Sequence, residues 1–395
     1  MRFSIEASEL KNIINRVSAV TNKKSSLSIV STLEFSVKPN GILHVVATDL
    51  EQFASVSAST ADYETGTIYA YVENITKAIA NMSGMISVEL ASEDIISIRT
   101  QKKKTEIRAL DSKDVYPEFP SLDMPLAFSA NEGDLINTFI ALKPMLASLE
   151  TSRPIFSGFN VDAIHGRCIS CDTFRYGVKK LGWNFHNKEL NITIPGKIAD
   201  SLKKIGNAKG KDDISVFVGK PNEEKENTQI AFIGKDYVYA VKLLAGQYID
   251  IDRVTPSLVD YELSVDTKEF SAVAKEYISI TDAKQDALMY FMCENSRVSA
   301  ATITSKFRTT DVLENSVVSK LYSPFISCFD AKFIREAMEL FDGEVVNAHG
   351  AQKTATNGYN LHGIIFENDS YTAYVLPIGG HKKPVDEIRE FMTES

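Results

Sequence analysis

The sequence has few cysteines, little glycine or proline and no long apolar run. Four cysteines in 395 residues are too few for a disulfide scaffold. Glycine (20 residues) and proline (12 residues) are too scarce for a fibrous or low-complexity chain. No apolar run approaches the roughly 18 residues that a membrane-spanning helix needs. Because acidic Glu6 and Glu9 stand where a signal peptide would have its apolar stretch, we expect a soluble, cytoplasmic protein.

Length and charge narrow the class of protein further. A chain of 395 residues is too long for one ordinary core, so we expect two or three domains. Its 44% hydrophobic and 24% charged residues are typical of a soluble globular protein. The net charge of −9 argues against a general nucleic-acid coat protein. A local basic patch is still compatible with this net charge, because the net charge does not say how the charged residues are distributed over the surface.

The most informative feature is a pattern that occurs three times, starting at residues 3–10, 128–135 and 263–270. Each copy predicts a short strand, a polar helix start with an acidic residue in its first turn, and an apolar helix face. The apolar positions keep helical spacing: Leu10, Ile13, Ile14 and Val17; Leu135, Phe139, Leu142 and Leu146; Phe270, Val273 and Tyr277. Pro144 predicts a kinked or shortened second helix.

Further landmarks shift together with these three starts. A predicted hairpin follows each first helix, and a second helix recurs near residues 75–79, 198–202 and 333–337. Two helices with many antiparallel strands in each third indicate the α+β class and exclude a βαβ parallel sheet. Proline-bearing connectors predict three domains, 1–124, 125–256 and 257–378, followed by an extension, 379–395.

Motifs for catalysis or metal binding are weak. Cys168 and Cys171 form a C-x-x-C on a predicted strand, where residues three apart point to opposite faces, so buried packing is favoured over a metal site. The segment 206–212 has the wrong spacing for a P-loop and reads as a polar turn. The six histidines show no metal-binding spacing. We therefore predict no catalytic residue, no metal site and no cofactor. An enzyme with an unrecognised site is a further interpretation, but no group of residues supports it.

Cations on the predicted helices form the remaining signal. They are Lys11, Arg16, Lys77, Lys197, Lys203, Lys204, Lys275, Lys332 and Arg335. Taken singly, each is more typical of a solvated helix face than of a contact. Taken together on equivalent helices of a repeat, they predict a common basic surface. Such a surface suits a protein that surrounds a polyanion without reading its sequence.

Several segments, in order, carry a family resemblance: Met1-Arg2-Phe3, Thr48–Glu51, Glu118–Leu122, Cys171–Tyr176, Gly246–Asp250 with Arg253-Val254, and Tyr374–Ile378. Over about residues 1–378 the chain resembles the bacterial DNA polymerase III beta subunit, the sliding clamp. The resemblance implies a non-enzymatic processivity factor, a head-to-tail homodimer whose six domains form a ring around double-stranded DNA. Lysines on the inner helices would contact phosphates without sequence preference, and Lys23 and Lys24 join that set by resemblance.

The family also implies a groove between the second and third domains that binds short peptides of DNA polymerase and the clamp loader. The matching positions are Phe156, Thr173, Phe174, Arg175, Tyr176, Ile249, Arg253, Val254, Leu361, Gly363, Tyr374, Leu376, Pro377 and Ile378. Without the resemblance, ordinary packing would be the preferred interpretation of these residues. Thr105 and Ile107 match positions of the subunit interface.

The chain departs from the family pattern at four places. Thr173-Phe174 replaces glycine-histidine and Ile249 replaces proline, so the groove is expected to be narrower or to select different peptides. Thr105 replaces an interface phenylalanine, which would weaken ring closure. The extension 379–395 is compatible with a short amphipathic helix near or partly over the groove, or with a frayed terminus. Thr105 and the extension are the only support for an alternative, a clamp-fold peptide-binding or regulatory module that no longer closes a ring.

Overall fold

The computed structural model describes residues 1–21, 27–110, 116–149, 152–219, 228–282, 285–379 and 383–394. The chain forms two compact units, one of residues 1–140 and 182–245 and one of residues 141–181 and 246–395. The polypeptide therefore passes between the units three times. This division into compact units does not test the three predicted domain ranges, which stay a prediction. Within the described part of the chain, no helix has the length and apolar character needed to cross a bilayer.

A strand leads into a helix six times, in two sets of three. The first set is β1 (Arg2–Glu6) with α1 (Ala7–Val17), β10 (Leu126–Asn131) with α3 (Glu132–Leu142), and β19 (Tyr261–Asp266) with α6 (Thr267–Ile280). The second set is β6 (Gly66–Tyr71) with α2 (Val72–Ile79), β15 (Asn191–Pro195) with α4 (Ile198–Ile205), and β24 (Phe325–Asp330) with α7 (Ala331–Met338). The predicted α+β class and the threefold pattern are confirmed.

The helix ends follow from local chemistry. The Asp266 carboxylate accepts hydrogen bonds from the first backbone N–H groups of α6, and Asp330 does the same for α7, which satisfies donors that have no partner within the helix. Helix α3 ends at Leu142, and Pro144 lies in the following 3-10 turn, Lys143–Met145. The proline thus shortens the helix, as predicted, because its ring blocks continuation of the helical hydrogen bonds.

The first unit contains two antiparallel sheets. Their remaining strands are β2 (Thr32–Val37), β3 (Ile42–Thr48), β4 (Gln52–Ser59), β5 (Ala61–Glu64), β7 (Met85–Ser92), β8 (Ile95–Arg99), β9 (Lys104–Arg108), β14 (Asn184–Phe185), β16 (Asp213–Gly219), β17 (Gln229–Ile233) and β18 (Tyr237–Lys242). One sheet has the order β5-β1-β7-β8-β9, and the other has the order β14-β10-β16-β17-β18-β4-β3-β2-β6. The second of these is continuous across two of the predicted domains, because β18 pairs with β4.

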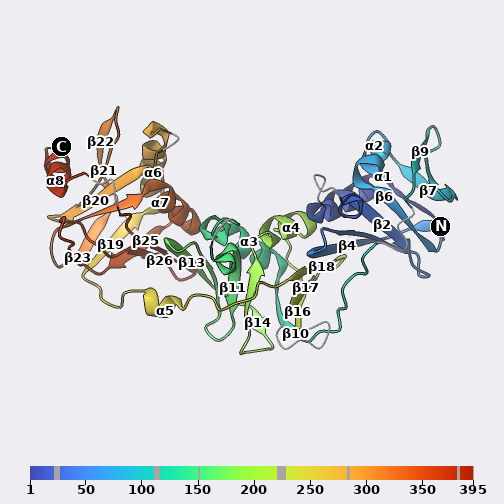
Figure 1. Ribbon diagram of the computed structural model, residues 1–395, viewed down its shortest axis with the longest axis horizontal. Coiled ribbons are helices and arrows are strands. Elements are labelled where there is room, and N and C mark those ends of the chain that lie inside the picture. The colour runs from blue at the N-terminus through green and yellow to red at the C-terminus, as the bar shows by residue number, and fades with distance from the viewer. Residues whose placement is uncertain are drawn as a thin grey trace. The chain divides into compact units, whose positions relative to one another are not determined.

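Helices α1, α2 and α4 cover one face of the long sheet in the first unit (Figure 1). The buried side chains of α1, Leu10, Ile13, Ile14 and Val17, are the ones that its periodicity predicted. The polar sides of the three helices remain on the surface of the unit. Residues predicted to be cationic contacts therefore share one side of this sheet.

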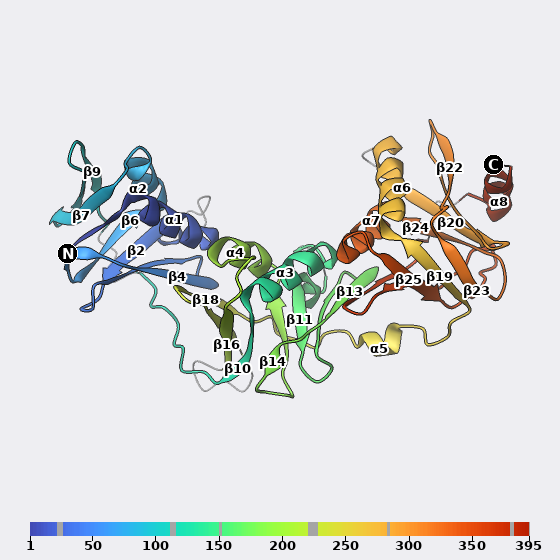
Figure 2. The ribbon, with the colours of Figure 1, turned by 180° about the vertical axis from the view of Figure 1, so that it is seen from behind.

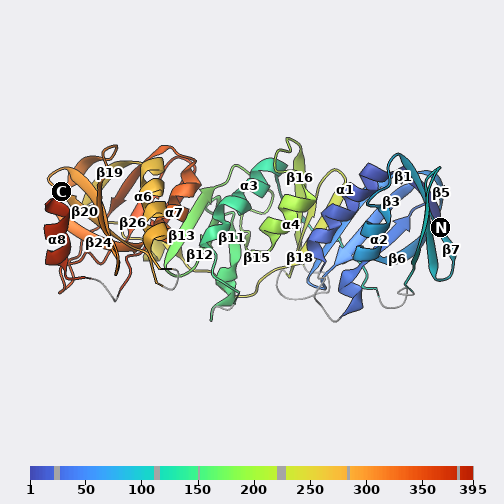
Figure 3. The ribbon, with the colours of Figure 1, turned by 90° about the horizontal axis from the view of Figure 1, so that it is seen from above.

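The second unit also contains two antiparallel sheets. Its remaining elements are β11 (Gly158–Asp162), β12 (Arg167–Cys171), β13 (Arg175–Lys180), α5 (Ile251–Val254), β20 (Leu288–Glu294), β21 (Arg297–Ile303), β22 (Arg308–Val312), β23 (Val317–Leu321), β25 (Val345–Gly350), β26 (Ile364–Glu367), β27 (Tyr371–Val375) and α8 (Val385–Thr393). One sheet runs β11-β12-β13-β27-β26-β25-β19-β23, and the other runs β22-β21-β20-β24. Helices α6 and α7 lie side by side in this unit (Figure 3).

The extension forms a helix, α8, that packs against the four-stranded sheet β22-β21-β20-β24. Ile388 and Met392 are completely buried there, in contact with a face that includes Tyr290, Met292 and Cys328. Phe291, on the opposite face of β20, packs against Phe270 of α6. Helices α8 and α6 therefore cover opposite faces of the same sheet (Figure 2). The amphipathic interpretation of the extension is confirmed, and the frayed alternative is wrong for the described residues.

Candidate nucleic-acid surface and peptide groove

The predicted cations of the first unit fall into two groups. Arg16 donates to both carboxylate oxygens of Asp236, at 2.5 and 2.8 Å, and to the Ile205 carbonyl at 2.6 Å. Lys197 lies 2.5 Å from a carboxylate oxygen of Glu51 and 3.4 Å from one of Asp49. These pairs join β4 and α1 to the segments around α4 and β18. Both cations are therefore paired with carboxylates inside the unit and are poor candidates for DNA contacts.

Other cations remain exposed. Lys203 and Lys204, on the last turn of α4, form no ion pair with any described residue. Lys77 pairs with Glu73 one turn earlier on α2, with both side chains largely exposed. Such an exposed pair contributes little to stability and is easily exchanged for another anion. Lys203 and Lys204 are therefore the strongest candidates for phosphate contacts in this unit.

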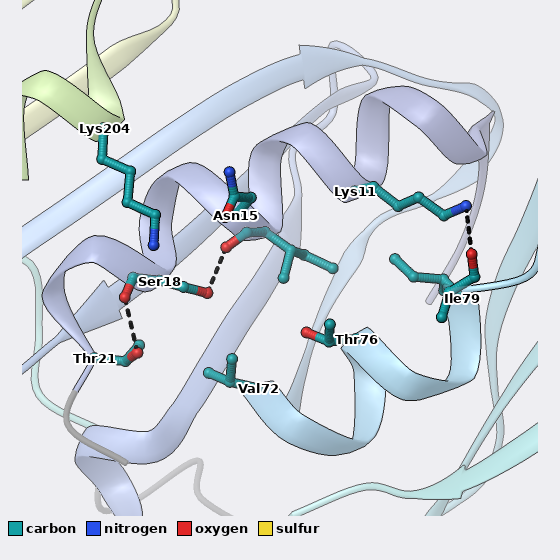
Figure 4. A pocket seen from close by; sticks show the side chains of 10 residues that line it. Lys11, Asn15, Ser18, Thr21, Val72, Thr76, Ile79 and Lys204 are labelled. Atoms are coloured by element: carbon teal, nitrogen blue, oxygen red, sulfur yellow. Dashed lines mark hydrogen bonds between the residues drawn. The ribbon is translucent and has the colours of Figure 1, made fainter.

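A pocket of about 540 Å³ lies between α1, α2 and the end of α4 (Figure 4). Its lining includes Lys11, Asn15, Thr76 and Lys204, with Ser18 and Thr21 at the end of α1. The Lys11 ammonium donates to the Ala80 and Met82 carbonyls at 2.9 and 2.7 Å, so it also closes the end of α2. Ammonium, amide and hydroxyl groups are the groups with which proteins contact the phosphates and sugars of nucleic acids. The sequence interpretation missed Asn15, Ser18, Thr21 and Thr76, because uncharged polar residues on a helix carry no special pattern.

In the second unit, Lys275 of α6 and Lys332 of α7 are exposed and form no ion pair among the described residues. Arg335 instead lies 3.1 Å from Glu336 and 3.5 Å from Glu339. Lys23 and Lys24 lie outside the described residues. Exposed lysines thus lie on α4 and α7, which belong to one set of repeated helices, and on α6, which belongs to the other, whereas the two predicted arginines form ion pairs.

The predicted groove residues divide by depth. Phe156, Tyr176 and Tyr374 are buried in one cluster, here called the groove cluster, and Ile249 and Leu376 pack against its edge. Burial raises the pKa of Tyr176 to about 12, and its hydroxyl lies 2.5 Å from the Thr255 hydroxyl. The cluster also contains Tyr248, Ile251 and Ile365, which the sequence interpretation did not select. The buried members are therefore inaccessible, and we call them the floor of the predicted groove.

Other predicted groove residues are accessible, and three of them line a pocket. Val254 and Leu361 are each 47% exposed, and Arg253 is exposed beside Asp250. Phe174, which is 57% exposed, lines a pocket of about 810 Å³ together with Pro377 and Ile378. The extension contributes Gly379 and Lys383 to the same pocket. The first residues of the extension therefore lie beside three predicted groove residues, whereas α8 itself packs on the sheet β22-β21-β20-β24.

Backbone geometry fixes the turn that carries Thr173 and Phe174. Thr173 has φ +79°, a left-handed conformation that is unfavourable for a β-branched residue and natural for the glycine that it replaces. Leu50, its counterpart in the first repeat, has φ +77°. Asp172 accepts backbone hydrogen bonds from Phe174 and Arg175, as Asp49 does from Glu51 and Gln52. The same turn therefore recurs in both repeats at the predicted offset.

Arg175 is buried and joins β13 to α7. Its guanidinium donates to Asp172 at 3.0 Å and to the Pro144 carbonyl at 2.7 Å, and it lies 2.6 Å from Glu336. It also lies over the Phe333 ring, whose other contact is the Phe174 ring. A side chain only 3% exposed cannot be an open peptide contact in this state. Its observed role is to position Phe174 and Phe333.

Gly363 is needed for close packing beside the groove cluster. A Cβ atom at this position would collide with the Val375 carbonyl and the Tyr374 ring. The backbone of Gly363 therefore lies closer to strand β27 than it could if this residue had a side chain. Gly363 acts through its lack of a side chain.

An ion-pair network that the sequence interpretation missed holds α5 beside the groove cluster. Arg167 donates to both carboxylate oxygens of Asp252, at 2.9 and 2.7 Å, and to Asp162 at 3.1 Å. The hydrogen bonds from Arg167 lower the pKa of Asp252. Because α5 carries Arg253 and Val254, this bidentate pair positions two predicted groove residues. Residues 85 positions apart give no sequence signal for such a contact.

Thr105 and Ile107 lie on β9, which is an edge strand of its sheet. Both are half-buried, and they pair with Ile98 and Ile96 of β8. In the second unit, β22 is the edge strand of the four-stranded sheet. Strands β9 and β22 are thus two of the edge strands that have a partner strand on one side only among the described residues.

Cysteine and metal chemistry find no support in the described part of the chain. Cys168 and Cys171 are buried on β12, and burial raises the pKa of Cys171 to about 11. A thiol held protonated in this way is a poor nucleophile and a poor metal ligand. No group of three histidine, cysteine, aspartate or glutamate residues is arranged to hold a metal ion among the residues described.

Comparison of the structure with solved proteins defines its class. The structure matches the DNA polymerase sliding clamp of Bacillus subtilis with a TM-score of 0.83 at 17% identity, covering 96% of this chain and 100% of that one. It matches the DNA polymerase III subunit beta of Pseudomonas aeruginosa with a TM-score of 0.84 at 15% identity and the same coverage. The fold is that of a beta sliding clamp.

Sequence comparison gives the family. Residues 133–250 match the family model for the central domain of the DNA polymerase III beta subunit. The Beta sliding clamp of Bacillus subtilis is 24% identical over 283 residues, 68% of this chain and 72% of that protein. That of Lactococcus lactis is 20% identical over 67% of this chain and 70% of that protein. The family model thus matches the central part of the chain, and the predicted resemblance to the DNA polymerase III beta subunit family is confirmed. The sliding clamps that the chain resembles are non-catalytic processivity factors.

Proposed function

We propose that this protein is a DNA sliding clamp, a non-enzymatic processivity factor of DNA replication in the cytoplasm. Two copies would close head to tail into a ring around double-stranded DNA. The observation that carries the proposal is the set of exposed lysines on helices of the repeated pattern, in a chain with the clamp fold: Lys203 and Lys204 on α4, Lys275 on α6 and Lys332 on α7. Lysines without fixed partners bind phosphates weakly and exchange them quickly, which permits sliding.

The ring would be closed by the free strand edges. Strand β9, with Thr105 and Ile107, and strand β22 each have five residues and one open edge among the described residues. An antiparallel pair of edges from two copies satisfies backbone groups on both. One such contact at each end of the chain gives a closed dimer.

The groove would bind short peptides of a DNA polymerase and a clamp loader. Val254, Leu361 and Phe174 offer exposed apolar surface around a pocket and a rigid floor. Apolar anchors of an extended peptide are recognised by surfaces of this kind. Tethering a polymerase in this way keeps its primer end at a high effective concentration, which is the physical basis of processivity.

The test is retention on DNA of different topology. Loaded onto nicked circular DNA by its clamp loader, the protein should stay bound through gel filtration in high salt, and it should be lost when the circle is cut once. Equal retention on circular and linear DNA would contradict encirclement. Light scattering that shows only a monomer would favour the alternative, a clamp-fold peptide-binding module without a ring.

A further inference from the structure

Helix α8 is a fixed part of the second unit. Ile388 and Met392 are completely buried against the sheet β22-β21-β20-β24. The connection before the helix is also held, because the Lys383 N–H donates to the Tyr290 hydroxyl at 3.0 Å and its carbonyl accepts from the Tyr359 hydroxyl at 2.6 Å. A helix anchored on its apolar side presents its polar side in a constant orientation.

The charges of α8 are divided between its two flanks. Phe391 packs against Arg308 of β22, with the guanidinium carbon 4.6 Å from the ring centroid. Glu387 and Glu394, four residues before and three after Phe391, lie on the same flank, with Glu390 beside them at the exposed crest. Arg389 lies on the other flank, where it donates to Glu294 at 2.8 Å. The flank toward the open edge of β22 therefore carries an excess of glutamates, although Arg308 lies on it and Glu387 also lies 3.8 Å from the Lys383 ammonium.

The open edge of the first unit has the opposite charge. The turn between β8 and β9 and the strand β9, residues 99–108, carry five basic residues and one acidic residue. Lys104 pairs with Glu106, and Arg99 pairs with Glu89 at 2.7 Å. Lys102 and Lys103 are exposed and form no ion pair with any described residue. We call residues 99–108 the basic hairpin.

We propose that the acidic flank of α8, formed by Glu387, Glu390 and Glu394, is a docking surface for the basic hairpin of a second copy of this chain. The inference rests on the proposed ring, in which β22 of one copy meets β9 of the next. That contact would bring the hairpin to the flank of α8. Opposite charges beside an edge-to-edge contact speed correct encounter and disfavour pairing of like edges. The extension would thereby add contacts to an interface in which Thr105 stands where the family has an aromatic side chain.

A charge-swap experiment tests this inference. Variant one carries Glu387→Lys, Glu390→Lys and Glu394→Lys, and variant two carries Lys102→Glu, Lys103→Glu and Lys104→Glu. Each alone places like charges at both interfaces of its homodimer, so its dimer affinity in sedimentation velocity at low salt should fall roughly tenfold or more. Mixed together, the two variants form a heterodimer with opposite charges at both interfaces, and affinity should recover to within about threefold of wild type.

Controls separate charge from folding. Asp369→Lys changes an exposed acid in the turn between β26 and β27 and should leave dimer affinity unchanged. Replacing the three α8 glutamates by glutamine should give an intermediate loss, and circular dichroism should show unchanged melting for every variant. Wild-type affinity in either variant, or no recovery on mixing, would overturn the role of α8 while leaving the ring intact. A wild-type protein that stays monomeric at every concentration would overturn the ring and this inference with it.

Discussion

The two places where predicted domains join within a unit are built alike but differ in chemistry. In the first, β18 pairs with β4, and the Tyr239 and Ser201 hydroxyls both donate to the Gln52 side-chain oxygen, at 2.5 and 2.9 Å. In the second, β13 pairs with β27, and an aromatic cluster lies beside the strands. The first junction has a pocket of about 240 Å³ whose lining includes Glu51, Glu118 and Lys242.

The pocket at the second junction is about 810 Å³ and adjoins exposed apolar side chains. At the first junction the polar contacts lie beside a small apolar cluster that includes Phe53 and Phe119, whereas at the second Val254, Leu361 and Phe174 expose more apolar surface. A continuous sheet is therefore common to both junctions, and the larger exposed apolar surface distinguishes the second. We expect a peptide to bind where apolar side chains remain exposed around a rigid floor.

The largest expected effect tests whether a buried cation holds the second junction. Arg175→Ala would leave Glu336 and Asp172 without their shared partner inside the protein, and we expect a loss of about 3–5 kcal/mol in the free energy of unfolding. The measurement is urea denaturation followed by circular dichroism. Arg16→Ala at the first junction is the matched change, and it should cost less than half as much, because Asp236 is 46% exposed. Equal losses would contradict the difference between the junctions.

The second prediction concerns peptide binding. Val254→Asp or Leu361→Asp would place a charge among the accessible apolar residues of the groove, and affinity for a polymerase-derived peptide should fall at least tenfold. Fluorescence anisotropy with a labelled peptide measures the change. Leu50→Asp makes the same change on an exposed leucine at the first junction and should not alter affinity. Loss of binding in that control would indicate that the peptide binds at the first junction instead.

The third prediction separates free from paired cations. Lys203→Glu combined with Lys204→Glu should reduce the slope of log affinity for DNA against log salt by about 2, since each phosphate contact contributes about 0.9. Lys197→Gln, which removes a cation already paired with Glu51, should leave the slope unchanged. Titration of labelled duplex at several salt concentrations gives both slopes. An unchanged slope in the double variant would remove α4 from the DNA surface.

The smallest expected effect tests the equivalence of the two turns. Thr173→Gly and Leu50→Gly should each raise the free energy of unfolding by about 0.5–1 kcal/mol, because both residues have positive φ. Ser305, at the corresponding place in the third repeat, is not among the described residues with positive φ. Ser305→Gly should therefore lower stability by a similar amount, through the greater freedom of glycine in the unfolded chain. Thermal unfolding of the three variants decides the point.

Sequence periodicity found the helices and the repeat because these depend on local spacing. The buried face of α1 and the end of α3 before Pro144 are examples, since each is set by neighbours within a few residues. The roles of the predicted groove residues were harder to predict from the sequence. Phe156, Tyr176 and Tyr374 carry the same apolar signal as Leu361 and Val254, and only packing shows that the first three are floor and the last two are surface.

The cations show the same limit. Arg16, Lys197 and Lys203 look alike as helix-associated charges, yet two of them are held by carboxylates far away in sequence. The Arg167–Asp252 pair, which positions α5, has no local signature for the same reason. Long-range ion pairs depend on which segments the sheets bring together. The residue pattern along a single strand or helix does not contain that information.

By itself, the sequence determined the α+β class, the threefold strand–helix pattern, the amphipathic extension and the kinship with sliding clamps. These follow from residue spacing and local turn chemistry, which act over a few neighbouring positions. Tertiary structure decided which lysines are free, which aromatic residues are accessible, and on which sheet α8 packs. Those outcomes depend on contacts between residues tens to hundreds of positions apart, where burial and ion pairing select among side chains that are alike in sequence.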